Sequence, residues 1–196
     1  MRLARLAVIG LVLMSAAGCS STSSAPPAPA PPAPAADATL GPSGASSGPA
    51  TTLTVTSPVF TDGATIPKDY TCAGAGKMPG LAWKGDLKGS TAIAVVVDDP
   101  DAPVGTFVHL VVVDLPAGTT SLGDTLPAGA HYALNGAGRK GWTPPCPPSG
   151  THHYRFTVYG LSGPTGLPDG SSAADAEAAI LGKALVQGRL TGLVSH

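Results

Sequence analysis

The sequence has little charge of either sign and few aromatic residues. Only 12% of its 196 residues are Asp, Glu, Lys or Arg, and the formal net charge is −1. A chain without a basic excess lacks the electrostatic footprint of a nucleic-acid-binding protein. Aromatic residues make up only 5%, whereas 26 glycines and 21 prolines indicate a turn-rich protein rather than a helical bundle.

Long apolar runs are also scarce, and the most prominent one, residues 6–14, is too short to span a bilayer comfortably. It follows Arg2 and Arg5 and ends in small residues before Cys19, which is typical of a signal peptide over residues 1–18. The segment SAAGCS resembles a bacterial lipobox, so we expect Cys19 to carry acyl chains such as palmitate. The protein would then be exported and anchored to the extracytoplasmic face of the cell membrane. A plain secretory signal with a coincidental cysteine is the alternative.

Residues 19–50 are rich in Ser, Ala and Pro and include APPAPAPPAPA. This composition cannot bury a core and favours an extended, polyproline-like tether. A ligand for small proline-recognition domains is the alternative. We therefore expect one globular domain over residues 51–196, which is close to the usual domain size.

The chain has few cysteines, and their number limits how they can pair. If Cys19 is lipidated, Cys72 and Cys146 remain as a pair in an oxidising compartment. Two interpretations stay open, namely a structural disulfide or a free reactive thiol at Cys146 within the segment PPCPP.

Several segments are rich in β-branched residues and predict strands. Residues 91–97 and 107–114 are expected to be central strands with both faces covered, and residues 53–59 and 154–161 are further strands. A period of two places Tyr154, Phe156 and Val158 on one face of the last strand.

One helix is expected to close the chain. Ser172 can cap it, with Asp175 three residues later, and Gly188 is a natural end. The apolar stripe of this helix would consist of Ile180, Leu181, Ala184 and Leu185. The element pattern predicts a mainly β sandwich with a helical appendage.

Three of the five histidines fall in two short patches. Alternation places His109 on one strand face with Phe107, Val111 and Val113. Such a histidine is either a satisfied core residue or a functional one.

The second patch is a more specific indication of a site. His152 and Tyr154 share a face at the start of their strand, whereas His153 points the other way. An imidazole and a phenol are therefore aimed at one point, directly after the loop that contains CPPSGT.

The segment DDPDAP places Asp99 and Asp101 on either side of Pro100. A carboxylate beside a histidine fixes its tautomer or holds a proton on it. An aspartate, two histidines and a tyrosine in a proline-lined notch would present donors to a phosphate or carboxylate. Taken alone, DDPDAP is also typical of a solvated turn.

Four motifs together resemble one family. DDPDAP with FVHLVVVDLP, CPPSGTHHYRFTVYGL, F-x-D-G-x-x-I-P-x-x-Y-T-C at 60–72 and PGLAWKG at 79–85 are similar to phosphatidylethanolamine-binding proteins, in particular the bacterial Raf-kinase-inhibitor-like branch. The resemblance covers residues 53–194. It implies an antiparallel β-sandwich with a small anion pocket near one end. Carried over residue by residue, the ligand-binding set would be Asp99, His109, Pro147, Pro148, His152 and Tyr154.

The sequence departs from the family pattern in three places. His153 occupies the position of an arginine, and a histidine cannot reproduce that residue's fixed fork of donors. The loop between Pro148 and His152 is short, and the C-terminal helix lacks the histidine of many bacterial relatives. These departures affect the identity of the ligand rather than the fold.

The leading interpretation is therefore a surface lipoprotein that binds a small anion or phospholipid head group and modulates a partner protein. A protease or kinase inhibitor that acts by protein–protein binding is the alternative. A hydrolase is disfavoured because no G-x-S-x-G nucleophile elbow occurs. No cofactor is expected, and Asp99, His109 and His152 lack the sequence spacing of a metal site.

Overall fold

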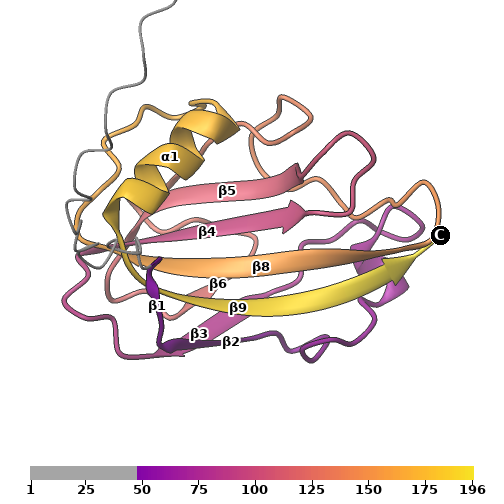
Figure 1. Ribbon diagram of the computed structural model, residues 1–196, viewed down its shortest axis with the longest axis horizontal. Coiled ribbons are helices and arrows are strands. Elements are labelled where there is room, and N and C mark those ends of the chain that lie inside the picture. The colour runs from indigo at the N-terminus through magenta and orange to yellow at the C-terminus, as the bar shows by residue number, and fades with distance from the viewer. Residues whose placement is uncertain (1–47) are drawn as a thin grey trace, which may run out of the picture. The chain divides into compact units, whose positions relative to one another are not determined.

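We describe residues 48–196 in a computed structural model of the chain. They belong to one compact unit with two sheets, a six-stranded sheet in the order β1-β9-β8-β4-β5-β7 and a three-stranded sheet in the order β2-β3-β6 (Figure 1). The strands are β1 (Ala50–Thr51), β2 (Leu53–Thr56), β3 (Leu81–Gly85), β4 (Ala92–Asp99), β5 (Phe107–Pro116), β6 (Ser121–Leu122), β7 (His131–Tyr132), β8 (Thr151–Leu161) and β9 (Ala184–Ser195). The helices are the 3₁₀ turn η1 (Lys68–Tyr70) and α1 (Ala173–Lys183). No helix in residues 48–196 is long and apolar enough to cross a bilayer.

The mainly β sandwich is confirmed, with one difference in strand direction. All pairings are antiparallel except that of β1, which runs parallel to β9 with Ala50 opposite Val186. The large sheet is therefore mixed rather than purely antiparallel.

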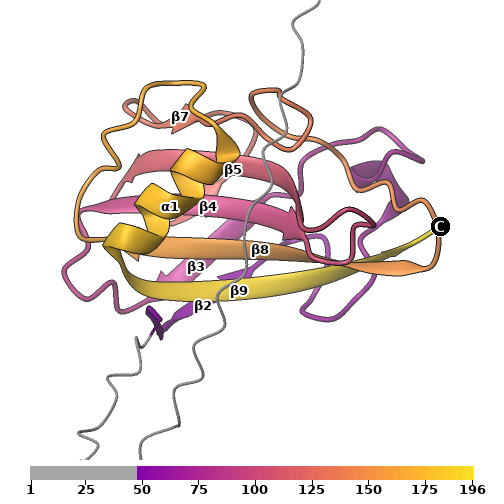
Figure 2. The same cartoon turned by 45° about the horizontal axis from the view of Figure 1, so that its top comes forward.

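Two cores lie on opposite faces of the six-stranded sheet. Between the two sheets, Trp83 of β3 and Leu53 of β2 pack with Val95 of β4 and Phe156 of β8. On the other face, α1 covers part of β4 and β5, and its Ile180 packs among small and β-branched residues of those strands (Figure 2). A sheet with both faces covered needs continuous apolar strands, which explains the runs at 91–97 and 107–114.

The alternation predicted for β8 is confirmed. Tyr154, Phe156 and Val158 all lie in the core between the sheets and are fully buried. Arg155 and Thr157 face the side of the sheet that carries α1, because successive strand side chains point to opposite faces.

The start of the predicted helix is confirmed, because the Ser172 side chain accepts a hydrogen bond from the backbone N–H of Asp175. Its predicted end at Gly188 is wrong. The helix ends at Lys183, and the chain continues as β9, so Gly188 is a strand residue. A Cβ at Gly188 would lie 2.2 Å from the carbonyl oxygen of Leu53, so this glycine permits a close strand approach instead of ending a helix.

Two members of the predicted helical stripe therefore belong to a strand. Ala184 and Leu185 begin β9, whereas Ile180 and Leu181 remain in α1. The ladder between β8 and β9 runs from residue 184 to residue 195, and this long-range pairing overrides the local helical pattern.

The cap of α1 gives a first testable result. We expect Ser172→Ala to lower the free energy of unfolding by about 1 kcal/mol, because the Asp175 N–H loses its acceptor. Urea denaturation measures the change. Ser172→Thr keeps the oxygen and should stay close to the parent protein, and an equal loss in both variants would contradict the capping explanation.

Candidate functional site

A buried acid–histidine pair joins the end of β4 to the start of β8. The Oδ2 atom of Asp99 lies 2.7 Å from Nδ1 of His152, and both side chains are less than 10% exposed. Asp99 Oδ1 also accepts the backbone N–H of Asp101 at 2.9 Å, which closes the turn around Pro100. Because a carboxylate only accepts, His152 donates from Nδ1, and its Nε2 is the nitrogen left for other partners.

The neighbouring carboxylates bind other residues of β8 and do not enter this pair. Asp98 forms a two-pronged ion pair with Arg155, whose Nε donates at 2.9 Å. Asp101 accepts from both the backbone N–H and Nδ1 of His153, each at 2.8 Å. These hydrogen bonds lower the pKa of Asp101. His153 thus binds the turn with its backbone N–H and one ring nitrogen.

A β-bulge positions His109. Across β4 and β5, Val97 pairs with Leu110 and Asp98 pairs with Val108, so His109 is an extra residue without an opposite partner. A bulge re-aims the side chain at which it occurs and disrupts the local alternation. His109 therefore points to the same side of the sheet as Leu110.

The strand face predicted for His109 is consequently wrong in part. Phe107 does lie beside it, with ring centroids 4.8 Å apart. Val111 and Val113, however, pack in the core under α1, on the opposite face. The bulge causes this difference, because one inserted residue moves everything after it to the other face.

His109 is held in one tautomer. Its Nδ1 lies 2.7 Å from the carbonyl oxygen of Thr143, and the Thr143 N–H donates to the carbonyl of His109 at 3.0 Å. A carbonyl only accepts, so neutral His109 carries its proton on Nδ1 and presents Nε2 as an acceptor. Burial lowers the pKa of His109, and this effect outweighs the hydrogen bond to Thr143 and the charge of Asp99, which both raise it.

The lowered pKa predicts a pH dependence of stability. Below about pH 6.5 the unfolded chain binds a proton at His109 that the folded protein does not. The free energy of unfolding should therefore fall as the pH falls from 6.5 towards the lower folded-state pKa. Urea unfolding at pH 7.5 and pH 5 measures the loss. In His109→Gln, which keeps an amide donor for Thr143, this part of the pH dependence should disappear, and an unchanged slope would contradict the assignment.

Tyr154 brings a buried hydroxyl to the same place. Its side chain is 0% exposed, and its ring packs edge-on against His109 at 5.2 Å between centroids. The hydroxyl makes no hydrogen bond of normal geometry within residues 48–196, although the Asp99 carboxylate and the Cys146 backbone lie near it. Burial and the negative charge of Asp99 raise the pKa of Tyr154 well above its ordinary range, so the phenol keeps its proton.

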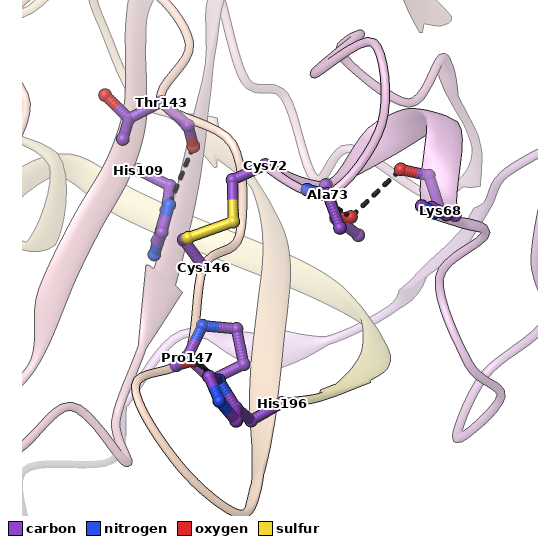
Figure 3. The surroundings of a disulfide bond; sticks show 9 residues. Lys68, Cys72, Ala73, His109, Thr143, Cys146, Pro147 and His196 are labelled. Atoms are coloured by element: carbon purple, nitrogen blue, oxygen red, sulfur yellow. Dashed lines mark hydrogen bonds between the residues drawn. A yellow bond between two sulfur atoms is a disulfide. The ribbon is translucent and has the colours of Figure 1, made fainter.

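These groups line a cavity of about 240 Å³. Of the six predicted site residues, the structure brings five together in its wall, namely Asp99, His109, Pro148, His152 and Tyr154. The sixth, Pro147, is buried outside the cavity, and its carbonyl lies 3.1 Å from Nδ1 of His196 (Figure 3).

Sequence reasoning missed much of the apolar wall. The turn after β4 adds Pro103 and Val104, and β5 adds Phe107. The loop before β8 adds Thr143, Pro144 and Cys146. Alternation in the extended segment PPCPP was the available signal, because residues 144, 146 and 148 line the cavity whereas 145 and 147 do not.

The loop that carries this wall is fixed at two points. Asn135 is buried, and its side-chain amide donates to the carbonyl of Gly141 and to Oγ1 of Thr143. Cys72 and Cys146 form a disulfide beside the His109–Thr143 hydrogen bond (Figure 3). The disulfide interpretation of the two cysteines is therefore the one that the structure shows, and Cys146 is not a free thiol.

The cavity has no permanent positive charge. Neither Lys nor Arg lines it, so its polar groups are one carboxylate, two imidazoles and two hydroxyls. No group of three or more His, Cys, Asp or Glu side chains within residues 48–196 is arranged to hold a metal ion.

The fold and the cavity define a class, a two-sheet β protein with a small ligand-sized cavity at one end of its central strands. Comparison with known families gives the family: the model of the phosphatidylethanolamine-binding proteins matches residues 56–195, and the chain belongs to this family.

Curated relatives and solved structures agree with this family assignment. The chain is 46% identical over 143 residues to "Putative lipoprotein LppC" of Mycobacterium tuberculosis, covering 71% of each chain. It is 41% identical over 142 residues to a UPF0098 protein of Aquifex aeolicus, covering 68% of this chain and 83% of the relative. The crystal structure of Escherichia coli YbcL, described as a new member of the mammalian PEBP family, superposes with a TM-score of 0.70 at 29% identity, covering 74% of this chain and 99% of YbcL.

Proposed function

We propose that this protein binds a phosphate-type anion or phosphate-bearing head group in the cavity between Asp99, His109, His152 and Tyr154. The observation that carries the proposal is the Tyr154 hydroxyl, which is buried, protonated and without a partner in the part of the chain described. A buried polar group left unsatisfied costs free energy, and a bound oxygen anion would satisfy it.

The other polar groups complement such a ligand. Asp99 holds His152 by Nδ1, which fixes the ring and leaves Nε2 as the nitrogen that can contact a ligand oxygen. His109 presents an acceptor, which suits the P–O–H group of a monoprotonated phosphate. Because the wall has no Lys or Arg, hydrogen bonds from these polar side chains would hold the ligand.

The apolar part of the wall suits an organic substituent on the phosphate. The apolar lining consists mainly of Pro103, Val104, Phe107, Pro144 and Pro148. Family membership supports the same ligand class, because the phosphatidylethanolamine-binding proteins bind phosphate-bearing head groups.

Binding, rather than catalysis, fits the residues of the wall. Cys146 is in a disulfide and cannot act as a thiolate nucleophile. Apart from Tyr154, the only hydroxyl in the wall is that of Thr143, which accepts a hydrogen bond from Asn135 instead of facing a general base. A hydrolase would need an activated nucleophile at this point.

We further propose that the domain is presented on the extracytoplasmic face of the membrane through a lipid on Cys19. The lipobox-like sequence supports this, and so does the name of the LppC relative. Residues 1–18, Cys19 and the tether 19–50 lie almost entirely outside the described residues, so these assignments, like the modulation of a partner protein, stay predictions.

Tyr154→Phe tests the proposed site, because it should lower phosphate affinity without lowering the stability of the fold. Removal of an unsatisfied buried hydroxyl should leave the free energy of unfolding unchanged or raise it by about 1 kcal/mol. Affinity for inorganic phosphate and phosphorylethanolamine, measured by NMR titration at pH 6, should fall about tenfold because one donor is lost. Tyr159→Phe, which changes a tyrosine outside the cavity, serves as the control. Unchanged phosphate affinity in Tyr154→Phe would contradict the proposed site.

A further inference from the structure

A second cavity, of about 280 Å³, lies on the other face of the six-stranded sheet. Its floor is formed by outward-facing residues of β4, β8 and β9, and its wall by one side of α1. Figure 2 shows α1 lying over β4 and β5 while the neighbouring strands β8 and β9 continue beside it. The proposed phosphate cavity lies on the opposite face of the sheet, because Asp98 lines the second cavity whereas the adjacent Asp99 lines the phosphate cavity.

Two pairs of charged side chains line this second cavity, which we call the groove, and only one of the pairs forms an ion pair. Asp98 and Arg155 neutralise each other through their two-pronged ion pair. Glu177 of α1 and Arg189 of β9 take part in no ion pair within residues 48–196. Arg189 uses only its Nε, which donates to Oγ1 of Thr157 at 3.0 Å.

The two unpaired charges flank one phenol. Burial raises the pKa of Tyr159, the charge and the side chain of Arg189 lower it, and the charges of Asp98 and Glu177 raise it. Arg189 and Glu177 line the same groove as Tyr159 and form no ion pair with each other. Burial and the charge of Asp98 raise the pKa of Glu177, and the charge of Arg155 only partly offsets them, so this carboxyl is partly removed from water.

The groove also has an apolar part. Ile180 is buried and Leu181, at 59% exposure, is one of few large apolar side chains open to solvent in the described chain. Val96 also lines the groove. A guanidinium, a carboxylate and aliphatic side chains in one groove complement a molecule that carries both charges and an aliphatic group.

We propose that this groove binds a small zwitterion with an aliphatic side chain, an amino acid or a short peptide, whose carboxylate pairs with Arg189 and whose ammonium pairs with Glu177. The free guanidinium N–H groups of Arg189 can take the carboxylate in a forked geometry, and the Tyr159 hydroxyl can add a third donor. The aliphatic side chain then lies against Ile180 and Leu181.

The experiment is an NMR titration of the purified protein with four probes. L-leucine and the dipeptide Leu-Leu carry both charges, N-acetyl-leucine lacks the ammonium, and leucinamide lacks the carboxylate. We expect the zwitterions to shift the signals of Ile180 and Leu181, and the two blocked compounds to bind at least tenfold more weakly, because each loses a charge-assisted contact. Binding of Leu-Leu without binding of leucine would identify short peptides, rather than free amino acids, as the ligand of the groove. Equal binding of all four probes, or no shift with any, would overturn the proposal.

Variants locate the site. Arg189→Gln and Glu177→Gln should each weaken leucine or dipeptide binding at least tenfold. The matched control is Arg139→Gln, which removes the same charge from an exposed loop outside the groove. Thermal melts establish that each variant is folded. Phosphate binding in the first cavity should stay unchanged in all three variants, and zwitterion binding should stay unchanged in Tyr154→Phe. If Arg189→Gln and Arg139→Gln weakened binding equally, the groove assignment would be wrong.

Discussion

His152→Ala should remove most of the affinity for inorganic phosphate and lower the free energy of unfolding by about 3 kcal/mol. The stability loss follows because the substitution leaves the buried Asp99 carboxylate without its partner. The loss of affinity, at least tenfold, follows because the substitution removes the Nε2 contact of His152 from the cavity wall. NMR titration with inorganic phosphate at pH 6 and urea denaturation measure the two effects.

The next residue of β8 provides the matched control. His153 also pairs with an aspartate, Asp101, but both side chains are exposed and neither lines the cavity. His153→Ala should change stability by less than about 1 kcal/mol, because surface ion pairs contribute little. The turn keeps its bond from the backbone N–H of residue 153. Equal loss of phosphate affinity in both variants would contradict the proposed site.

A second substitution separates binding from folding. His152→Gln retains an amide that can donate to Asp99 but lacks the second ring nitrogen that faces the ligand. We expect it to recover much of the lost stability while phosphate affinity stays low. Recovered affinity in this variant would show that the second ring nitrogen of His152 is not required.

Removal of the disulfide should have the largest effect on stability. Cys72 and Cys146 are 74 residues apart, and the chain-entropy account gives about 4 kcal/mol for a loop of this length. The double variant Cys72→Ala/Cys146→Ala should therefore melt on the order of 10 °C lower than the parent protein. Its phosphate affinity should also fall, because Thr143, Pro144 and Pro148 of the cavity wall lie close to Cys146 in the same loop.

Reductant gives an independent readout of the same bond. Dithiothreitol should lower the melting temperature of the parent protein to that of the double variant and leave the double variant unchanged. A parent protein that melts at the same temperature with and without reductant, under conditions that release two thiols on assay, would contradict the stabilising role.

Regular elements of the fold were predictable from the sequence, whereas features that depend on a partner strand were not. Alternation in β8 placed Tyr154 and Phe156 correctly, because their strand is regular over that stretch. The bulge at His109 depends on which residues of β4 lie opposite, and no local pattern marks it. The end of α1 was misplaced for the same reason, since the pairing of β9 with β8 decides it.

The candidate site shows the same division. Asp99, His109, His152 and Tyr154 were predicted from their side-chain chemistry and the family motifs, and the structure places all four in one cavity wall. Phe107 was named only as a neighbour of His109 on its strand, although it also forms the wall. Pro147 was included through the motif, but in an extended segment adjacent residues face opposite ways, and only Pro148 reaches the cavity.

The long strand β9 gives the domain two distinct poles. β1, the first strand after residue 48, pairs with β9 at Val186, whereas His152 of the cavity lies opposite Val194 at the other end of the same strand. Eight residues of β-strand separate these positions, about 26 Å. The described chain therefore begins near one end of β9, and the cavity lies toward the other end.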